Sequence, residues 1–270
     1  MISLNIIWHF DYVITGFLIA LSVGFVISFG LRFRLSTISF LTGVIILFLC
    51  TSISSNTLRL KYPMSLHMLS HVAIILIAAP LLIWGIESDL NKKSIAGRFT
   101  TFLGRYPLIS WITGTMTMWL WHVPYFFHLG METADMTNPG NHLMGLFGYI
   151  HLTSLLSGGI IFWAPVLFIQ TGSGLKPLET VLYLTTACIS CSVLGLLITF
   201  APPGMYISGM SMTGMSNISA LRDQQVAGLI MWVPCCFVYL TVSMLILIEW
   251  MSEKNNRRSA MIEIQKQKLA

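Results

Sequence analysis

The sequence predicts an all-α membrane protein, a polytopic bundle of about seven transmembrane helices. Hydrophobic residues make up 55% of the chain and charged residues only 9%, whereas about 25% of a typical soluble domain is charged. A membrane-crossing helix needs roughly 20 mostly apolar residues. Seven stretches meet this requirement, and they run approximately over residues 12–31, 37–55, 65–86, 107–127, 143–169, 177–200 and 225–250.

Prolines mark several ends of these stretches, for example Pro63, Pro107 and Pro177. Others fall inside the stretches, where a membrane helix tolerates a proline and often bends at it. These internal prolines are Pro124, Pro165 and Pro234. We expect a single transmembrane domain over residues 1–252, followed by a basic tail over residues 253–270.

The positive-inside rule predicts the orientation, because short cytoplasmic loops carry an excess of lysine and arginine. If the N-terminus lies outside, the outer side holds only Arg59, Lys61 and Arg222, and the inner side holds the other twelve of the 15 basic residues. The predicted topology is therefore N-out and C-in, with the basic tail touching anionic lipid in the cytoplasm. This reading also explains the net charge of +5 without nucleic acid as a partner.

All seven histidines fall in the outer half of this topology. His67 and His71 are four residues apart, so both imidazoles lie on one helical face, as in half of a transition-metal site. His122 precedes a proline that could turn its ring inward, and His151 is two turns into the fifth stretch. A polar ring at membrane depth usually faces the bundle interior and serves a function. The alternative is that such histidines hydrogen-bond helix ends and lipid headgroups.

The last outer loop is rich in methionine and carries Met205, Met210, Met212 and Met215 among glycines and serines. Thioethers are soft ligands that favour Cu(I), and imidazole also suits copper. Met64 and Met68 flank His67. Methionine also fills space in membrane chains without binding a metal, and the chain has 16 methionines.

The loop is followed by Asp223, Gln224 and Gln225 at the start of the seventh stretch. Asp223 could cap that helix, since a carboxylate suits a helix N-terminus. The two glutamines could instead hydrogen-bond a metal-ligating histidine and fix its orientation.

The five cysteines all lie inside apolar runs, so we expect no disulfide framework. Four of them lie at mid-depth in the sixth and seventh stretches, and small residues there commonly pack helix against helix. A buried thiol site is the other reading. The four residues are Cys188, Cys191, Cys235 and Cys236.

The sequence resembles the CtaG family of cytochrome c oxidase assembly factors over about residues 65–234. Three stretches carry the resemblance: residues 65–71 (SLHMLSH) running on to 79–82, residues 121–124 (WHVP) followed by His142, His151 and 162–166 (FWAPV), and residues 223–234 (DQQVAGLIMWVP). The family typically has glycine where this chain has Cys235-Cys236, and a second tryptophan where this chain has Ala164.

The resemblance implies a role in maturing haem-copper oxidase in the bacterial cytoplasmic (inner) membrane, with copper delivery as the expected activity. Together with the residues themselves, it predicts a non-enzymatic protein that holds Cu(I) and passes it to oxidase subunits. A periplasmic copper carrier is an expected further partner. The candidate metal ligands are His67, His71, His122, His151, Met205, Met210, Met212 and Met215, supported by Asp223, Gln224 and Gln225.

Three other functions stay open. Paired histidines could be axial haem ligands in a membrane oxidoreductase. The mid-depth cysteines could belong to a copper transporter. The protein could also be a chaperone for oxidase subunits that binds no metal.

Overall fold

The structure is a computed structural model, and it describes residues 11–29, 34–52, 62–87, 95–133, 142–168, 174–202, 205–206 and 217–269. The described part is helical, and no strand occurs in it. Its elements are α1 (Tyr12–Phe29), α2 (Leu35–Ser52), α4 (Pro63–Ala73), η1 (Ile74–Ala78), α5 (Ala79–Glu87), α6 (Ile95–Arg105), α7 (Pro107–His122), α8 (Pro124–Thr133), α9 (His142–Leu167), α10 (Pro177–Phe200) and α11 (Asn217–Leu269).

Five helical segments in the described part are long and apolar enough to cross a membrane. The shorter apolar helix Tyr12–Ser28 accompanies them. The all-helical, multi-span prediction is therefore confirmed in outline, while the count of seven and the orientation stay predictions. The five segments are Leu35–Ser52, Pro63–Ile86, Leu146–Leu167, Pro177–Phe200 and Ile218–Ser259.

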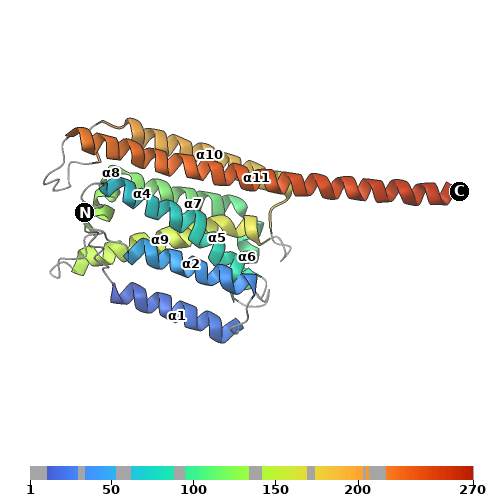
Figure 1. The fold of residues 1–270 in the computed structure, drawn as a ribbon, viewed down its shortest axis with the longest axis horizontal. Coiled ribbons are helices and arrows are strands. Elements are labelled where there is room, and N and C mark those ends of the chain that lie inside the picture. Colours follow the sequence, from blue (N-terminus) through green and yellow to red (C-terminus); the bar gives the residue numbers. More distant parts are fainter. Residues whose placement is uncertain are drawn as a thin grey trace, which may run out of the picture.

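The helices form one bundle in which α4, η1 and α5 occupy the middle (Figure 1). α11 packs against α10 on one side and α4 on the other, while α9 contacts α5, η1 and α7. α2 lies against α5, and α1 lies against α2 at the edge of the bundle. Large apolar side chains such as Leu182, Phe200 and Phe237 are mostly exposed on the outer surface. A continuous apolar exterior of this kind suits lipid rather than water.

The fourth predicted span is wrong as a single helix over residues 107–127, because the chain breaks at Val123. This residue is extended, with φ −63° and ψ 130°, and it separates α7 from α8. Pro124 explains the break, since a proline disfavours helical geometry in the residue before it. The break leaves His122 as the last residue of α7, with a buried side chain.

The third span contains a π-helical turn, η1, directly after the helix that carries His67 and His71. The wider turn breaks the ordinary hydrogen-bond pattern, and the indole Nε1 of Trp163 on α9 donates to the carbonyl of Ile75 at 2.9 Å. Such turns occur frequently at functional sites. Here the turn lies one helical turn beyond His71 and is clamped by α9.

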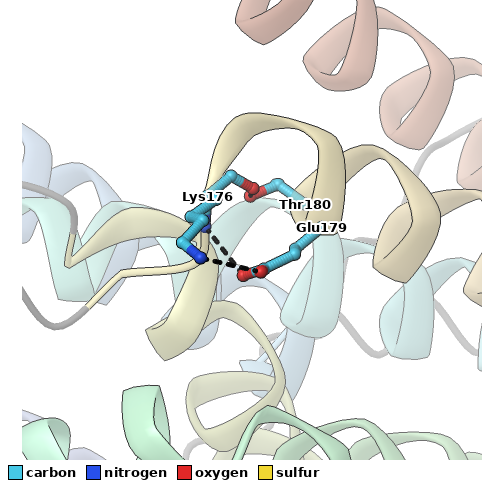
Figure 2. Close-up of polar contacts among 3 residues, drawn as sticks. All are labelled: Lys176, Glu179 and Thr180. Atoms are coloured by element: carbon cyan, nitrogen blue, oxygen red, sulfur yellow. Dashed lines mark hydrogen bonds and ion pairs between the residues drawn. The ribbon is translucent and has the colours of Figure 1, made fainter.

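α10 begins at Pro177, directly after the N-cap residue Lys176. Figure 2 shows the contacts of Lys176 with Glu179 in the first turn of the helix. The backbone N–H of Lys176 donates to Glu179, and the backbone N–H of Thr180 donates to the carbonyl of Lys176. The ammonium of Lys176 lies 3.6 Å from the Glu179 carboxylate, in an exposed pair that contributes little to stability.

α11 begins at Asn217 rather than near residue 225 and continues to Leu269, well past the rest of the bundle (Figure 1). The predicted boundary between membrane domain and tail at residue 252 therefore falls inside one continuous helix. Residues 253–259 on this extension are exposed. The assignment of the extension as a cytoplasmic tail stays a prediction.

Candidate metal centre

Four histidine rings from three helices converge at one end of the bundle. His71 is at the centre: the centroid of its ring lies 4.3 Å from that of His67, 4.7 Å from that of His151 and 5.3 Å from that of His122. The rings of His67 and His151 are 5.3 Å apart and nearly parallel. These are the four histidines predicted from the sequence, and the fold brings all of them together.

The helices place these rings by simple spacing. His67 and His71 are four residues apart on α4 and therefore share one face. His151 comes from α9, which packs against α8 and η1. His122 ends α7, where Pro124 prevents the helix from continuing. Three separate helices thus bring the four rings to the same point.

His71 is 1% exposed, and among the described residues neither of its ring nitrogens has a hydrogen-bond partner. The Nε2 atom of His151 is also buried without one. A buried polar atom that makes no bond costs about 1–3 kcal/mol, so three such atoms in one cluster call for a ligand that satisfies them.

His67, His71 and His151 form a group in which one ring nitrogen from each lies within 4.8 Å of the others. Three nitrogens that bind one metal ion at about 2.0–2.1 Å lie about 3.5 Å apart. Small side-chain rotations would close this difference. The donor set of three imidazoles therefore fits a transition-metal ion.

The orientation of the His122 ring is fixed by its own helix. Its Nδ1 lies 2.6 Å from the carbonyl oxygen of Met118, one turn earlier, and can only donate there. This assignment puts the hydrogen of a neutral ring on Nδ1 and leaves a lone pair on Nε2. That lone pair faces the Met68 thioether, with Nε2 3.1 Å from Sδ.

Two lone pairs that face each other at this distance repel unless a cation lies beside them. Nitrogen and thioether sulfur are together a soft donor pair of the kind that Cu(I) favours. Met68 is fully buried on α4, between the two histidines of that helix in sequence. Met68 is not among the ligands predicted from the sequence. Its spacing of three residues from His71, which puts both on one face, is the signal that could have identified it.

Aromatic side chains cover the cluster at the end of the bundle. Phe127 on α8 is fully buried, and its ring meets the rings of His67 and Tyr206 edge-on. Tyr206 is buried, and its hydroxyl donates to the carbonyl of His122 at 3.0 Å. The centroid of the Trp121 ring lies 4.4 Å from that of His151. These three aromatic residues were not predicted.

The beginning of the methionine-rich loop lies next to this cover. Met205 is about half exposed, and its carbonyl oxygen lies 3.1 Å from Nε2 of His128, which donates to it. Tyr206 follows it directly in sequence, so the loop starts beside the histidine cluster. The other three predicted thioether ligands, Met210, Met212 and Met215, lie outside the described residues.

Asp223 stabilises the start of α4. Its carboxylate accepts the backbone N–H of Met64 at 2.8 Å, the backbone N–H of Ser65 at 3.2 Å and the hydroxyl of Ser65. A carboxylate at a helix N-terminus satisfies orphan donors and interacts favourably with the helix dipole. The sequence suggested that Asp223 caps its own helix; this is wrong, because α11 already begins at Asn217 and Asp223 lies within it.

The two glutamines differ in their surroundings. Gln224 is fully buried, and its amide donates to the carbonyls of Ile198 and Ala201 at the end of α10. Its Oε1 has no partner among the described residues. Gln225 is exposed. Asp223 and Gln224 on α11 therefore contact the start of α4 and the end of α10.

A cavity of about 30 Å³ lies deeper in the bundle. Its lining includes Ile75, Met118, Ser190, Cys191 and Tyr239. It holds about one or two water molecules, and pockets for organic ligands are typically about 300–1,000 Å³. Its size therefore suits an ion or water.

The fold and the cluster define a multi-span helical membrane protein with a candidate site for a transition-metal ion at one end of the bundle. The chain belongs to the family described as "Cytochrome c oxidase caa3 assembly factor (Caa3_CtaG)", whose model matches residues 32–253. The resemblance seen in the sequence is thereby confirmed and extended at both ends. Comparisons with curated proteins and with solved structures gave no match.

Proposed function

We propose that this protein binds Cu(I) as cargo at the histidine cluster and delivers it to cytochrome c oxidase during assembly. The observation that carries the proposal is the buried group of His67, His71 and His151, in which His71 has two unpartnered ring nitrogens. Membership of an oxidase assembly family supports the destination.

The thioethers favour copper over zinc as the ion. Three imidazoles alone suit several metals, since imidazole binds zinc, copper, iron and nickel. Met68 adds a thioether that faces His122, and Met205 begins a methionine-rich loop beside the cluster. Thioether ligands select Cu(I) among the ions available to a cell.

The proposed topology puts this site at the outer face of a bacterial inner membrane, with the N-terminus outside and the C-terminus inside. α4 begins at the site, α7 ends there, and α11 begins there. Chain order puts α6 at the opposite end, where it carries the exposed Arg98 and Arg105 and the exposed Phe99 and Phe102. Basic and aromatic side chains on one short helix suit the inner headgroup region and its anionic lipids.

Transfer proceeds by exchange of ligands between methionines and histidines, without a chemical conversion of a substrate. The methionine-rich loop receives the ion, from a periplasmic copper carrier among other sources, and the histidine cluster holds it until an oxidase subunit takes it. No nucleophile or acid–base pair is required for this role.

Haem binding has less support. Two axial imidazoles must leave room for a macrocycle between them, whereas the rings of His71 and His151 are only 4.7 Å apart and tilted against each other. Metal-free chaperone activity would leave the unpartnered nitrogens of His71 unexplained.

The test is the metal content of the purified, detergent-solubilised protein after Cu(I) loading under reducing conditions. We compare the wild type with a His67→Ala/His71→Ala/His122→Ala/His151→Ala variant, and use His128→Ala as a matched control at the same end of the bundle. The expected result is copper in the wild type and the control and its loss from the quadruple variant at unchanged helix content. Absence of copper from the wild type would contradict metal delivery, and a visible haem band would support the oxidoreductase.

A further inference from the structure

Four cysteines lie on α10 and α11, which pack against each other. Cys188 Sγ lies 2.8 Å from Cys236 Sγ, and Cys191 on α10 and Cys235 on α11 are also buried. Cys188 and Cys191 are one helical turn apart on α10, and Cys235 and Cys236 are neighbours in sequence on α11. The site described above uses none of these four residues.

The two helices approach closely because glycines face each other across the contact. A Cβ atom on Gly195 would lie 2.6 Å from Cβ of Trp232 and 3.0 Å from the carbonyl oxygen of Gly228. Small residues at such positions let membrane helices pack backbone to backbone. The approach brings the cysteine side chains of both helices within reach of each other.

The thiols are largely buried, and few polar atoms surround them. Cys188, Cys191 and Cys235 are buried, and Ser192 Oγ lies 3.1 Å from Cys236 Sγ. Cys191 donates to the carbonyl of Met231. No lysine or arginine, which would compete for a thiolate, is among these partners.

We propose that Cys188 and Cys236 form a second, sulfur-based Cu(I) site inside the bundle, with Cys191 and Cys235 beside it. Two sulfurs on facing helices suit the soft Cu(I) ion, which thiolates select. With metal–sulfur bonds of about 2.3 Å, a linear site separates the sulfurs by about 4.6 Å. Rotation of the two side chains about their Cα–Cβ bonds would widen the distance between the sulfurs from 2.8 Å to this value.

The charge balance favours one thiolate and one thiol. Binding breaks the S–H bond of one cysteine, releases its proton to water and forms a copper–sulfur bond, and the second cysteine donates a sulfur lone pair. No electron is transferred. One positive ion and one thiolate leave the site neutral, which avoids the high cost of a net charge in the membrane interior.

The cavity is lined by residues that neighbour each of the two sites. Its lining includes Cys191 from the thiol group and Met118, whose carbonyl holds the His122 ring. The sulfur site nevertheless stands on its own geometry, and it does not require the histidine cluster to bind metal.

The test starts from a variant with intact cysteines but without the histidine site, His67→Ala/His71→Ala/His151→Ala. The full chain, reduced and in detergent, is titrated with Cu(I) without oxygen against a chromogenic Cu(I) chelator. We expect about one Cu(I) per chain, with ultraviolet absorption from sulfur-to-copper charge transfer. Adding Cys188→Ser and Cys236→Ser should weaken binding at least tenfold, whereas adding Cys50→Ser, on α2, should not change it.

A second measurement avoids any effect of substitution on folding. In the wild-type protein, Cu(I) should protect Cys188 and Cys236 from a membrane-permeant alkylating reagent and leave Cys50 as reactive as before. The proposal is overturned if the histidine variant retains no Cu(I), if the cysteine substitutions leave binding unchanged, or if Cu(I) gives these two thiols no protection. If the histidine cluster binds no copper, the wild type and the histidine variant bind the same amount of Cu(I), and only the cysteine substitutions reduce it.

Discussion

The Nε2 atom of His122 lies 3.1 Å from the Met68 sulfur, and the other ring nitrogen of His122 is held by the carbonyl of Met118. The histidine can therefore neither turn away nor donate a hydrogen to the thioether. The pair is arranged as two donors to one soft cation. Ordinary core packing would not require a histidine at this position.

From this relationship we expect Met68→Leu to weaken Cu(I) binding about 10- to 100-fold, the range seen when groups supporting a metal site are removed. Leucine has a similar volume, so stability should change by less than about 1.5 kcal/mol. Zinc binding, which depends on imidazole, should change little. The measurement is Cu(I) affinity by competition with a chelator, with the exposed Met244→Leu as control. Equal Cu(I) affinity in both variants would remove Met68 from the site.

Asp223 should control the stability of the helix that carries His67 and His71. Asp223→Ala removes the acceptor for two N–H groups and one hydroxyl at the start of α4, and loss of a cap costs about 0.5–2 kcal/mol. We expect a lower midpoint of thermal unfolding in detergent and weaker copper binding. Asp223→Asn, which keeps an acceptor oxygen, should lie between.

The neighbouring residue Gln225 provides the control for this experiment, because its side chain is exposed. Gln225→Ala should leave both the unfolding midpoint and copper binding unchanged. If Asp223→Ala behaves like Gln225→Ala, the cap does not support the site.

Trp163 should hold the π-helical turn beneath the cluster. Trp163→Phe keeps most of the ring but removes the N–H that donates to Ile75, which leaves a buried carbonyl unsatisfied at a cost of about 1–3 kcal/mol. The unfolding midpoint should fall clearly. Trp84→Phe is the control, because Trp84 is 56% exposed toward the surroundings of the bundle. Similar midpoints in the two variants would show that the turn needs no such clamp.

The close approach of α10 and α11 makes a further prediction. Gly195→Ala puts a Cβ against Trp232 and should destabilise the protein by about 1–3 kcal/mol through overpacking. It should also reduce crosslinking of Cys188 to Cys236 by a short thiol-specific crosslinker. Gly24→Ala is the matched control, since a Cβ there meets nothing within 4 Å. Unchanged stability and crosslinking in Gly195→Ala would contradict the tight helix contact.

Much of the fold could be predicted from the sequence because apolar length alone indicates membrane-crossing helices. The spans are expected to be helical because no water in the bilayer core can hydrogen-bond the backbone N–H and C=O groups, and a helix pairs these groups internally. The break at Val123 could also be predicted, because Pro124 disfavours helical geometry in the residue before it. The π-helical turn was not, because no residue type at Ile74–Ala78 marks it. The Trp163 indole that donates to the Ile75 carbonyl lies 88 residues away in sequence.

The histidine cluster could be predicted from depth and spacing, and the fold brings its four members together. The contact between Asp223 and Met64 could not be predicted, since the two residues are 159 positions apart in sequence and meet only after α4 and α11 have packed. Tyr206 and Phe127 were missed for the same reason. An aromatic residue that covers a site has no local pattern that separates it from lipid-facing or core aromatics.

The most direct test of the account is the copper content of the oxidase from cells whose only copy of this protein is a variant. Cells carrying His71→Ala should yield cytochrome c oxidase with normal haem but with copper reduced several-fold, and added copper should partly restore it. Cells carrying His128→Ala should yield oxidase with the wild-type copper content. Fully copper-loaded oxidase from cells carrying His71→Ala would contradict the proposal that the histidine cluster delivers the metal.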